Sequence, residues 1–457
     1  MRWSAFTKLT AGVGGALLLA IGVAAPAAAD TTYDVAPVAP TSHYTVLGTL
    51  AELDGMLYFP GGPPGSVDPR LWRIDPSAGT AVEVAVAQHA EFEHVGSVVV
   101  EGGYVYFVAT PTATPSLSGV YRYDPATDAV TSFAGSGLPV MELVFAAGVP
   151  YVVDGAGTLA YLDPADPSAP PVAPAPAACS GGGAYGAAEN LSAVGDGVAF
   201  AGRCGPDDVQ LFVYDRATGM SVVDPATVTP AGADISDPRD MVGFGGDLYY
   251  NAGNAASDQR TFRFDPDANA VIEPDPAATD PQRLFLFQGL LTWFARDAAD
   301  AVIVVQLHGD APVLLPISSY GEFEAAIGAV PWGGRMLVNG FYTGSGGTDA
   351  TVFVYDPSIG AFTRVVATGA AFVAPFVAAD GTGYIVSGSG PTDAIVSRII
   401  ATTPAVPVVP ADEPAMPVLP ATGADPTPWL ALGALSVAVG AALLAIRRLA
   451  PRARPRR

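Results

Sequence analysis

The sequence predicts an all-β protein in which one repeat occupies most of the 457 residues. A glycine followed by an apolar or aromatic stretch returns every 43 to 49 residues between Gly55 and Gly381. In most repeats a second apolar strand follows and ends in Asp-Pro or a looser copy of it. No convincing helical periodicity interrupts these landmarks. Four short strands in a repeat of this length are typical of a β-propeller blade. We therefore predict a single β-propeller of eight four-stranded blades, with seven blades as the alternative.

Two landmarks account for the strands and turns of each repeat. The repeat glycine precedes an apolar strand, as in Gly103-Tyr-Val-Tyr-Phe. Asp followed by Pro favours the first two positions of a type I turn, so we expect these aspartates to form turns rather than to serve catalysis. The clearest pairs are Asp75-Pro76, Asp124-Pro125, Asp265-Pro266 and Asp356-Pro357, and the glycines are Gly55, Gly103, Gly148, Gly197, Gly246, Gly289, Gly334 and Gly381.

The two ends of the repeat region are expected to meet in the last blade. The eighth copy stops at Arg398–Ala401 without a fourth strand, and His43–Leu47 precedes the first copy. If His43–Leu47 supplies the missing strand, the ring closes and leaves no exposed sheet edge. The propeller is therefore predicted over 43–404, after an N-terminal linker at 30–42.

The turn sequences resemble those of a loose class of propellers with Tyr-Asp-Pro-x-Thr-Gly turns. Asp124-Pro-Ala-Thr-Asp128 and Asp215-Arg-Ala-Thr-Gly219 carry this likeness. The double glycines precede the second strand, whereas kelch repeats carry theirs after it, and the Trp-Asp ending of the WD class is missing. The resemblance implies a propeller without naming an activity.

The N-terminus has the features of a secretory signal peptide over residues 1–29. Arg2 and Lys8 supply the charged start, Leu9–Val23 supplies the apolar run, and small residues precede Asp30. An exported protein is therefore expected, with cleavage before Asp30.

The C-terminus contains three parts in a fixed order. Leu419-Pro420-Ala421-Thr422-Gly423 is followed by an uncharged apolar run at 429–446, long enough for a transmembrane helix in the precursor. A basic tail at 447–457 would hold the end of that helix in the cytoplasm. The arrangement resembles the LPXTG sorting signal of Gram-positive surface proteins. Residues 405–418 form a spacer rich in proline and alanine.

This resemblance implies two partners, a sortase and peptidoglycan. The sortase thiol would attack the carbonyl of Thr422, release the chain from Gly423 onward, and transfer Thr422 to an amine of the peptidoglycan precursor. The precursor would span the plasma membrane transiently, and the mature protein would be anchored covalently to the cell wall. Lys8 is the sole lysine. The mature chain therefore lacks the lysine amine that joins the shaft subunits of sortase-built pili.

The net charge and the cysteine content indicate which partners and which covalent cross-link to expect. The net charge is −23, and the predicted mature region is more acidic still because the basic tail is removed. Such a surface repels phosphate backbones, so nucleic acid is excluded as an expected partner. Cys179 and Cys204 are the two cysteines, and in an exported protein we expect one disulfide between them.

Candidate ligand-binding residues lie in the loops that enter each innermost strand. Propeller sites usually lie at one mouth of the central channel, where such loops converge. Polar residues recur there on successive blades: Glu93, His94, Glu142, Glu189, Asn190, Arg239, Asp240 and Arg283. Simple solvation of these loops is the competing interpretation. No catalytic, metal-binding or cofactor-binding motif is assigned.

These observations support two functional hypotheses. The preferred one is a wall-anchored ligand-binding or adhesion module that engages an unknown extracellular glycan or protein. The alternative is a wall-associated enzyme, a polysaccharide lyase or hydrolase, with its site at the propeller mouth. The binding hypothesis is preferred because no catalytic constellation stands out.

Overall fold

The computed structural model places the described residues in one compact unit, Asp30–Thr403. The described residues are 32–38, 45–46, 50–63, 65–66, 68–84, 92–111, 118–133, 140–206, 208–224, 227–231, 233, 235–253, 259–266, 268–275, 277–321, 323–342, 350–365, 372–378, 380–390 and 393–402. The predicted signal peptide, spacer, sorting motif, membrane span and basic tail lie outside them. Within the described ranges, no helix is both long enough and apolar enough to cross a membrane.

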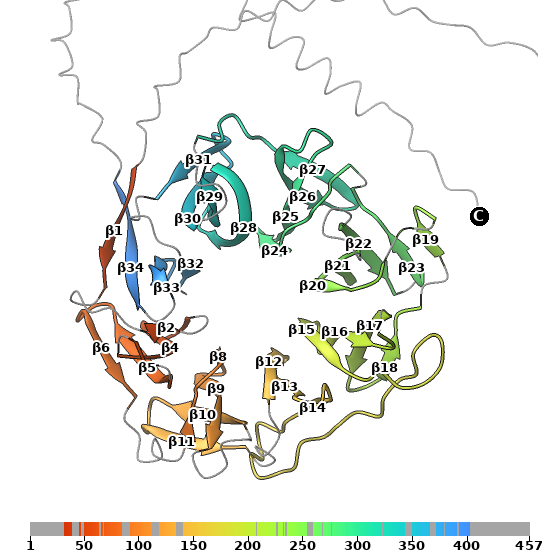
Figure 1. Ribbon diagram of the computed structural model, residues 1–457, viewed down its shortest axis with the longest axis horizontal. Coiled ribbons are helices and arrows are strands. Elements are labelled where there is room, and N and C mark those ends of the chain that lie inside the picture. Colours follow the sequence, from red (N-terminus) through yellow and green to blue (C-terminus); the bar gives the residue numbers. More distant parts are fainter. Residues whose placement is uncertain are drawn as a thin grey trace, which may run out of the picture. The chain divides into compact units, whose positions relative to one another are not determined.

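Eight sheets, antiparallel apart from one strand pair in blade five, stand around a common centre as the blades of a propeller (Figure 1). This confirms the predicted all-β fold and the count of eight rather than seven. Blade one contains β2 (Thr45–Val46), β3 (Ala51–Leu53), β4 (Met56–Gly62), β5 (Arg70–Asp75) and β6 (Thr80–Glu83). Blade two contains β7 (Phe92–Glu93), β8 (Val98–Glu101), β9 (Tyr104–Pro111), β10 (Gly119–Asp124) and β11 (Ala129–Ser132). Blade three contains β12 (Val140–Ala146), β13 (Val149–Asp154) and β14 (Leu159–Tyr161).

The remaining five blades follow in chain order. Blade four contains β15 (Ala188–Val194), β16 (Gly197–Arg203), β17 (Val209–Asp215) and β18 (Gly219–Val222). Blade five contains β19 (Thr227–Thr229), β20 (Arg239–Phe244), β21 (Asp247–Ala252), β22 (Arg260–Asp265) and β23 (Ala270–Ile272). Blade six contains β24 (Phe285–Phe287), β25 (Leu290–Arg296), β26 (Val302–His308) and β27 (Ala311–Leu315). Blade seven contains β28 (Phe323–Trp332), β29 (Arg335–Tyr342), β30 (Ala350–Asp356) and β31 (Ala361–Arg364). Blade eight contains β32 (Phe372–Val377), β33 (Gly383–Gly390), β34 (Asp393–Thr402) and β1 (Thr32–Pro37).

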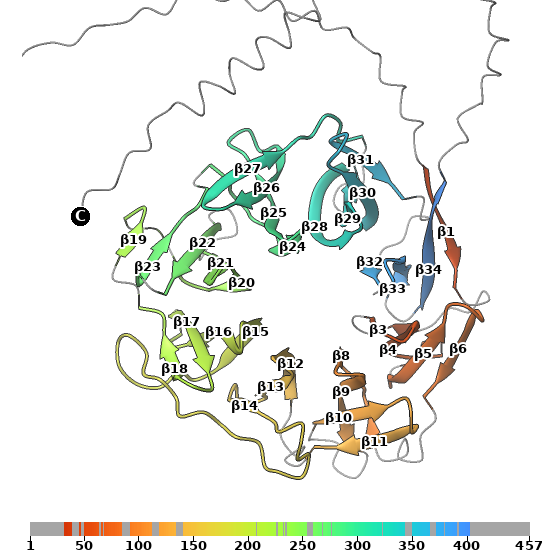
Figure 2. The ribbon, with the colours of Figure 1, turned by 180° about the vertical axis from the view of Figure 1, so that it is seen from behind.

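Several blades depart from the four-stranded pattern. The inner position of blade one is divided between β2 and β3, which both pair with β4. Figure 2 shows β3 beside β4. In blade three, a single bridge from Tyr161 to Val172 takes the place of a fourth strand, within a proline-rich segment that cannot supply a full ladder. Blade five gains β19 as a parallel neighbour of β23.

The ring closes with a strand earlier in the chain than the one we predicted. β1 pairs antiparallel with β34 along its full length, from Thr32 opposite Thr402 to Pro37 opposite Ser397. The expectation that His43–Leu47 completes blade eight is therefore wrong, because Thr45–Val46 pairs with β4 in blade one. The closing strand lies inside the 30–42 stretch that was expected to be a linker. Pairing a first strand with a last strand nevertheless covers the free edge as anticipated.

Apolar clusters fill the junctions between neighbouring blades. Strand β4 shows the reason, because alternate side chains of a strand point to opposite faces. Leu57 and Phe59 pack against blade eight, whereas Tyr58 packs against blade two. The same division recurs at every junction around the ring. Each sheet is thus buried on both faces, which explains the nearly continuous apolar runs in the sequence.

The repeat glycine lies in the turn between the first and second strand of a blade or, as at Gly197, directly after it. Gly103 adopts a φ of 82° there, a left-handed conformation that side chains with a Cβ rarely adopt. Gly197 is needed for a different reason, because a Cβ there would lie 2.1 Å from the Tyr214 carbonyl oxygen. Turn geometry and close strand packing therefore both favour glycine at this point of the repeat.

The repeated aspartates form turns, as predicted. Asp215 accepts hydrogen bonds from the backbone amides of Ala217 and Thr218 at 2.8 and 2.9 Å. These bonds, led by the one from Thr218, lower the pKa of the Asp215 carboxyl below its ordinary value. At Asp124 the hydroxyl of Thr127 is the main cause of the same downward pKa shift.

The lowered aspartate pKa values predict that acid destabilises the propeller. Each carboxylate stabilises the fold above the unfolded pKa of about 3.9, and this contribution is lost as pH falls through the lower folded pKa. We expect the melting temperature to fall as pH drops from about 5 towards 2, measured by circular dichroism. Asp215→Asn keeps a turn-forming side chain that does not titrate, so its pH dependence should be shallower. An identical slope in the parent protein and the variant would contradict this account.

The β1–β34 pairing predicts that Tyr33 is essential to ring closure. Tyr33 is 3% exposed, and its ring lies 5.8 Å from that of Trp332 in blade seven. Tyr33→Ala should lower the free energy of unfolding by about 3 kcal/mol in chemical denaturation, because it leaves a cavity between two blades. Asp34→Ala, an exposed position on the same strand, is the matched control and should change stability by less than about 0.5 kcal/mol. Equal effects at the two positions would rule out a structural role for this strand.

Candidate ligand-binding site at the channel mouth

A pocket of about 320 Å³ lies where the innermost strands of blades four, five and six meet. Its lining residues are Asn190, Leu191 and Ser192 from β15, Asp240, Met241 and Val242 from β20, and Arg283 and Leu284 just before β24. In Figure 1 these strands face the centre of the ring. The pocket brings together three of the candidate residues, Asn190, Asp240 and Arg283, from three successive blades. We call it the mouth pocket.

Irregular strand pairing gives the mouth pocket its shape. The register of β15 shifts between Glu189 and Ser192, and that of β20 shifts between Arg239 and Val242. At each bulge one residue adopts a left-handed conformation, Asn190 with a φ of 56° and Asp240 with a φ of 50°. Asn and Asp tolerate this conformation better than other residues with a Cβ. The bulges redirect side chains and backbone amides that a regular ladder would have used.

Asp240 and Arg283 form the charged part of the mouth pocket. Their closest side-chain atoms are 3.8 Å apart, and the Arg283 side chain is 73% exposed. The amide nitrogen of Asn251, a fully buried residue, lies 3.3 Å from Asp240 Oδ2 and holds the carboxylate in place. Asn251 also accepts a hydrogen bond from Thr261 at 3.0 Å. The arrangement presents a fixed acceptor beside a guanidinium that is free to reorient towards a ligand.

Two further candidates stabilise β15 rather than line the pocket. Both oxygens of Glu142 in blade three accept hydrogen bonds from blade-four amides, Asn190 N at 3.0 Å and Leu191 N at 2.6 Å. Glu142 thus satisfies the amides that the bulge releases. Glu189 accepts a hydrogen bond from Arg203 at 2.9 Å, which raises the pKa of that guanidinium.

The other candidates lie elsewhere. Glu93 is in β7 of blade two, opposite Thr110. His94 follows it with a φ of 49°, and its amide donates to Asp68 Oδ1 at 3.0 Å, which links blade two to blade one. Arg239 faces Asp237 at 3.8 Å. None of these three lines the mouth pocket, and within the described ranges no group of acidic, histidine and cysteine residues could hold a metal ion.

Sequence reasoning missed Ser192 and Asn251. Ser192 lies within β15, beyond the loop that enters this strand, and no sequence motif marks it. Asn251 ends the apolar run Leu248-Tyr-Tyr-Asn. A polar, uncharged residue at the end of such a run is the feature of the sequence that could have indicated it. Its hydrogen-bond partners, Asp240 and Thr261, lie on other strands, so the sequence around Asn251 does not indicate them.

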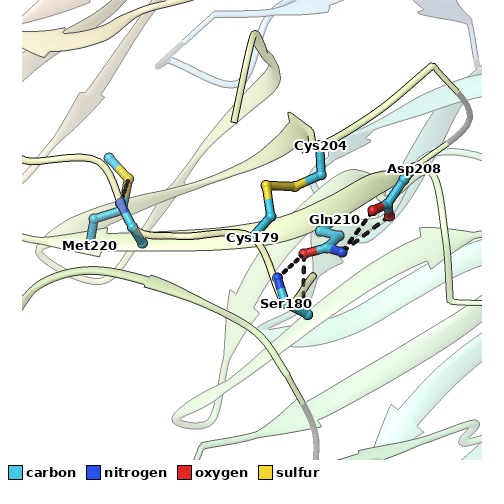
Figure 3. Close-up of a disulfide and its surroundings, with 7 residues drawn as sticks. Cys179, Ser180, Cys204, Asp208, Gln210 and Met220 are labelled. Atoms are coloured by element: carbon cyan, nitrogen blue, oxygen red, sulfur yellow. Dashed lines mark hydrogen bonds between the residues drawn. A yellow bond between two sulfur atoms is a disulfide. The ribbon is translucent and has the colours of Figure 1, made fainter. Parts of the chain in front are cut away.

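A disulfide fixes the long insertion between blades three and four. Cys179 and Cys204 are bonded, with Cα atoms 5.9 Å apart (Figure 3). The next residue, Ser180, donates to Gln210 Oε1 of β17 through both its backbone amide and its hydroxyl. The insertion is therefore held against the outer strands of blade four.

Residues 411–448 match the family model described as the LPXTG cell wall anchor motif. This match contains the pentapeptide, the apolar run and the beginning of the basic tail. The match and the eight-bladed ring together identify the kind of protein. The protein is a cell-wall-anchored surface β-propeller. It is exported, and a sortase attaches it covalently to peptidoglycan.

Solved structures resemble the surface propeller in fold alone. A prolyl endopeptidase is 13% identical with a TM-score of 0.47, and the match covers 76% of this chain and 54% of that one. A puromycin-hydrolysing peptidase of Mycobacterium tuberculosis is 17% identical with a TM-score of 0.44, over 70% and 55%. The Dos1 propeller is 14% identical with a TM-score of 0.47, over 80% and 95%. The surface propeller spans about half the length of the two peptidases. No curated protein sequence matches it.

The anchor motif predicts the fate of a sorting-signal variant. Thr422→Ala removes the residue at which the sortase is expected to cleave, so the precursor should keep its basic tail and become extractable from membranes by detergent. Mass spectrometry of the fractionated protein would show whether the C-terminal peptide ending at Arg457 is present. Ala421→Ser, at the variable position of the motif, is the control and should still be anchored. Normal wall attachment of the Thr422 variant would contradict the assignment.

Proposed function

We propose that the surface propeller is a binding or adhesion module whose mouth pocket engages an extracellular glycan or protein. The observation that supports this most directly is the convergence of Asn190, Asp240 and Arg283 from three blades in one pocket. The pocket offers amide, carboxylate and guanidinium groups beside apolar Leu191 and Val242. The lining is mainly polar, and 320 Å³ is within the range of small-molecule or side-chain pockets.

The composition of the mouth pocket favours binding over hydrolysis. Among the described residues that line it, Asp240 is the only carboxylate, and it is already engaged by Asn251 and Arg283. Glycoside hydrolysis ordinarily needs two carboxylates, one as acid and one as base or nucleophile. Glu142 cannot readily supply the second, because both of its oxygens accept backbone hydrogen bonds. A wall-associated lyase or hydrolase therefore remains the second hypothesis.

A glycan and extracellular-matrix array tests the proposal. The probe is the wall-anchored protein released by muramidase digestion, assayed both for retention and for turnover of each immobilised ligand. We expect retention without turnover. Arg283→Gln and Asp240→Asn should each weaken retention about three- to tenfold, because each removes one charged partner from a partly exposed site. Asn at position 240 keeps the left-handed preference, so the backbone should not change.

Arg216→Gln is the matched control for Arg283→Gln, since Arg216 is exposed in the β17–β18 turn and both substitutions remove one positive charge. It should leave retention unchanged. Turnover of a bound glycan would favour the enzymatic hypothesis. Equal retention by all three variants would contradict a ligand site at the mouth pocket.

A further inference from the structure

A smaller pocket, of about 110 Å³, lies beside the mouth pocket, between blades six and seven. Most of its lining comes from blade six, and Ala326 of β28 is the contribution of blade seven. Gln282 lines the smaller pocket, whereas the next residue, Arg283, lines the mouth pocket. The two pockets therefore adjoin the same stretch of backbone, the segment that leads into β24. We call the smaller one the side pocket.

The side pocket lies at the same end of the ring as the mouth pocket. Arg296, the last residue of β25, lines it and pairs with Thr279, ahead of β24. Asn251 links the two pockets, because its amide nitrogen lies 3.3 Å from Asp240 Oδ2 in the mouth pocket and 3.5 Å from the backbone oxygen of Gln282. One ligand that fills the mouth pocket can therefore place a substituent in the side pocket.

The polar residues of the side pocket have a donor and an acceptor to spare. Arg296 directs Nε at Asp280, 3.8 Å away, and Nη1 at Asp300, 3.3 Å away, and within the described ranges its Nη2 has no partner. Gln282 Nε2 lies 3.4 Å from the carbonyl oxygen of Asp280, which leaves Gln282 Oε1 without a partner in the same part of the chain. A ligand group that suits both offers an acceptor to the guanidinium and a donor to the side-chain amide.

The charges around the two pockets favour a neutral ligand. Arg296 faces two carboxylates, and Arg283 faces the carboxylate of Asp240. An anion would therefore meet three carboxylates and only two guanidinium groups. A cation would compete with an arginine for each carboxylate. A neutral group that carries both a donor and an acceptor meets neither cost.

The apolar part of the side pocket fits a methyl group. It consists of Phe294, which is 1% exposed, together with Ala295, Val302 and Ala326. Because liquid water occupies about 30 Å³ per molecule, 110 Å³ accommodates a substituent of a few heavy atoms rather than a sugar ring. A hydroxyl group would form the hydrogen bonds but leave the apolar lining uncovered. A donor, an acceptor and a methyl group on a few atoms make up an acetamido group.

We propose that the ligand of the surface propeller is an N-acetylated amino sugar, with its ring in the mouth pocket and its acetamido group in the side pocket. The hydroxyl groups of the ring both donate and accept, which suits the mainly polar lining of the mouth pocket. The acetamido oxygen would accept from Arg296, its N–H would donate to Gln282, and its methyl group would contact Val302. The role of the side pocket rests on the function proposed for the mouth pocket, because the sugar ring has to lie there.

Calorimetric titration with three sugar tetramers tests this proposal. Chitotetraose carries acetamido groups, cellotetraose carries hydroxyl groups at the same positions of the same backbone, and the fully deacetylated tetramer carries ammonium groups there. The protein is the Thr422→Ala chain in a detergent without a sugar headgroup, because this chain has no attached peptidoglycan sugar. We expect chitotetraose to bind about tenfold tighter than either of the others, since it adds a buried methyl group and two hydrogen bonds.

Variants separate the side pocket from the mouth pocket. Ala326→Leu should fill the side pocket and reduce the affinity for chitotetraose to that for cellotetraose. Gln282→Met, which keeps the shape but loses the acceptor, should weaken chitotetraose binding about threefold. Arg283→Gln should weaken the binding of both tetramers alike, about three- to tenfold. Ala217→Leu, at an exposed position of the β17–β18 turn, is the control for Ala326→Leu and should bind as the parent does.

The possible failures of the two proposals differ. Equal affinity for chitotetraose and cellotetraose, or a preference that survives in both Ala326→Leu and Gln282→Met, would overturn the role of the side pocket and leave a sugar site at the mouth pocket. Tightest binding of the deacetylated tetramer would show that positive charge is recognised instead of the acetyl group. Absence of binding to all three tetramers would overturn the amino-sugar proposal, whereas retention of a protein on the array would still support a binding function for the mouth pocket.

Discussion

Each sheet of the ring has two apolar faces, and a neighbouring sheet must cover each of them. Side chains of one strand, such as Leu57, Tyr58 and Phe59 of β4, divide between the two adjacent junctions. A chain of blades with open ends would expose one such face at either end. β1 prevents this by completing blade eight, so that blade eight can pack against both blade seven and blade one. The rest of the architecture depends on this closure.

The same constraint determines where ligands can be accommodated. Apolar packing is dense in the middle of each junction, so space opens where strands end or lose register. The mouth pocket lies at the bulges of β15 and β20.

The features that sequence reasoning found are those that repeat. The glycine turns and the aspartate turns recur at a fixed spacing, and together they predicted the blades and their number. β1 escaped notice because its partner strand is about 370 residues away, and a short segment containing proline gives little strand signal of its own. The missing fourth strand of blade three was not predicted either, because its place in the sequence is taken by a proline-rich segment. At the mouth, polar residues near the inner strands pointed to Asn190, Asp240 and Arg283, whereas the role of Glu142 in capping amides depends on a neighbouring blade.

The closing pair also has a mechanical consequence. The chain continues from Thr402, the last residue of β34, towards the residue that a sortase joins to the wall. Tension on this covalent tether would therefore load β34 first. Blades four and five lie across the ring from blade eight (Figure 1), so a force applied there has to pass through several blade junctions before it reaches β34. The antiparallel ladder with β1 ties that loaded strand to the very start of the domain and resists its removal when it is drawn along its own length.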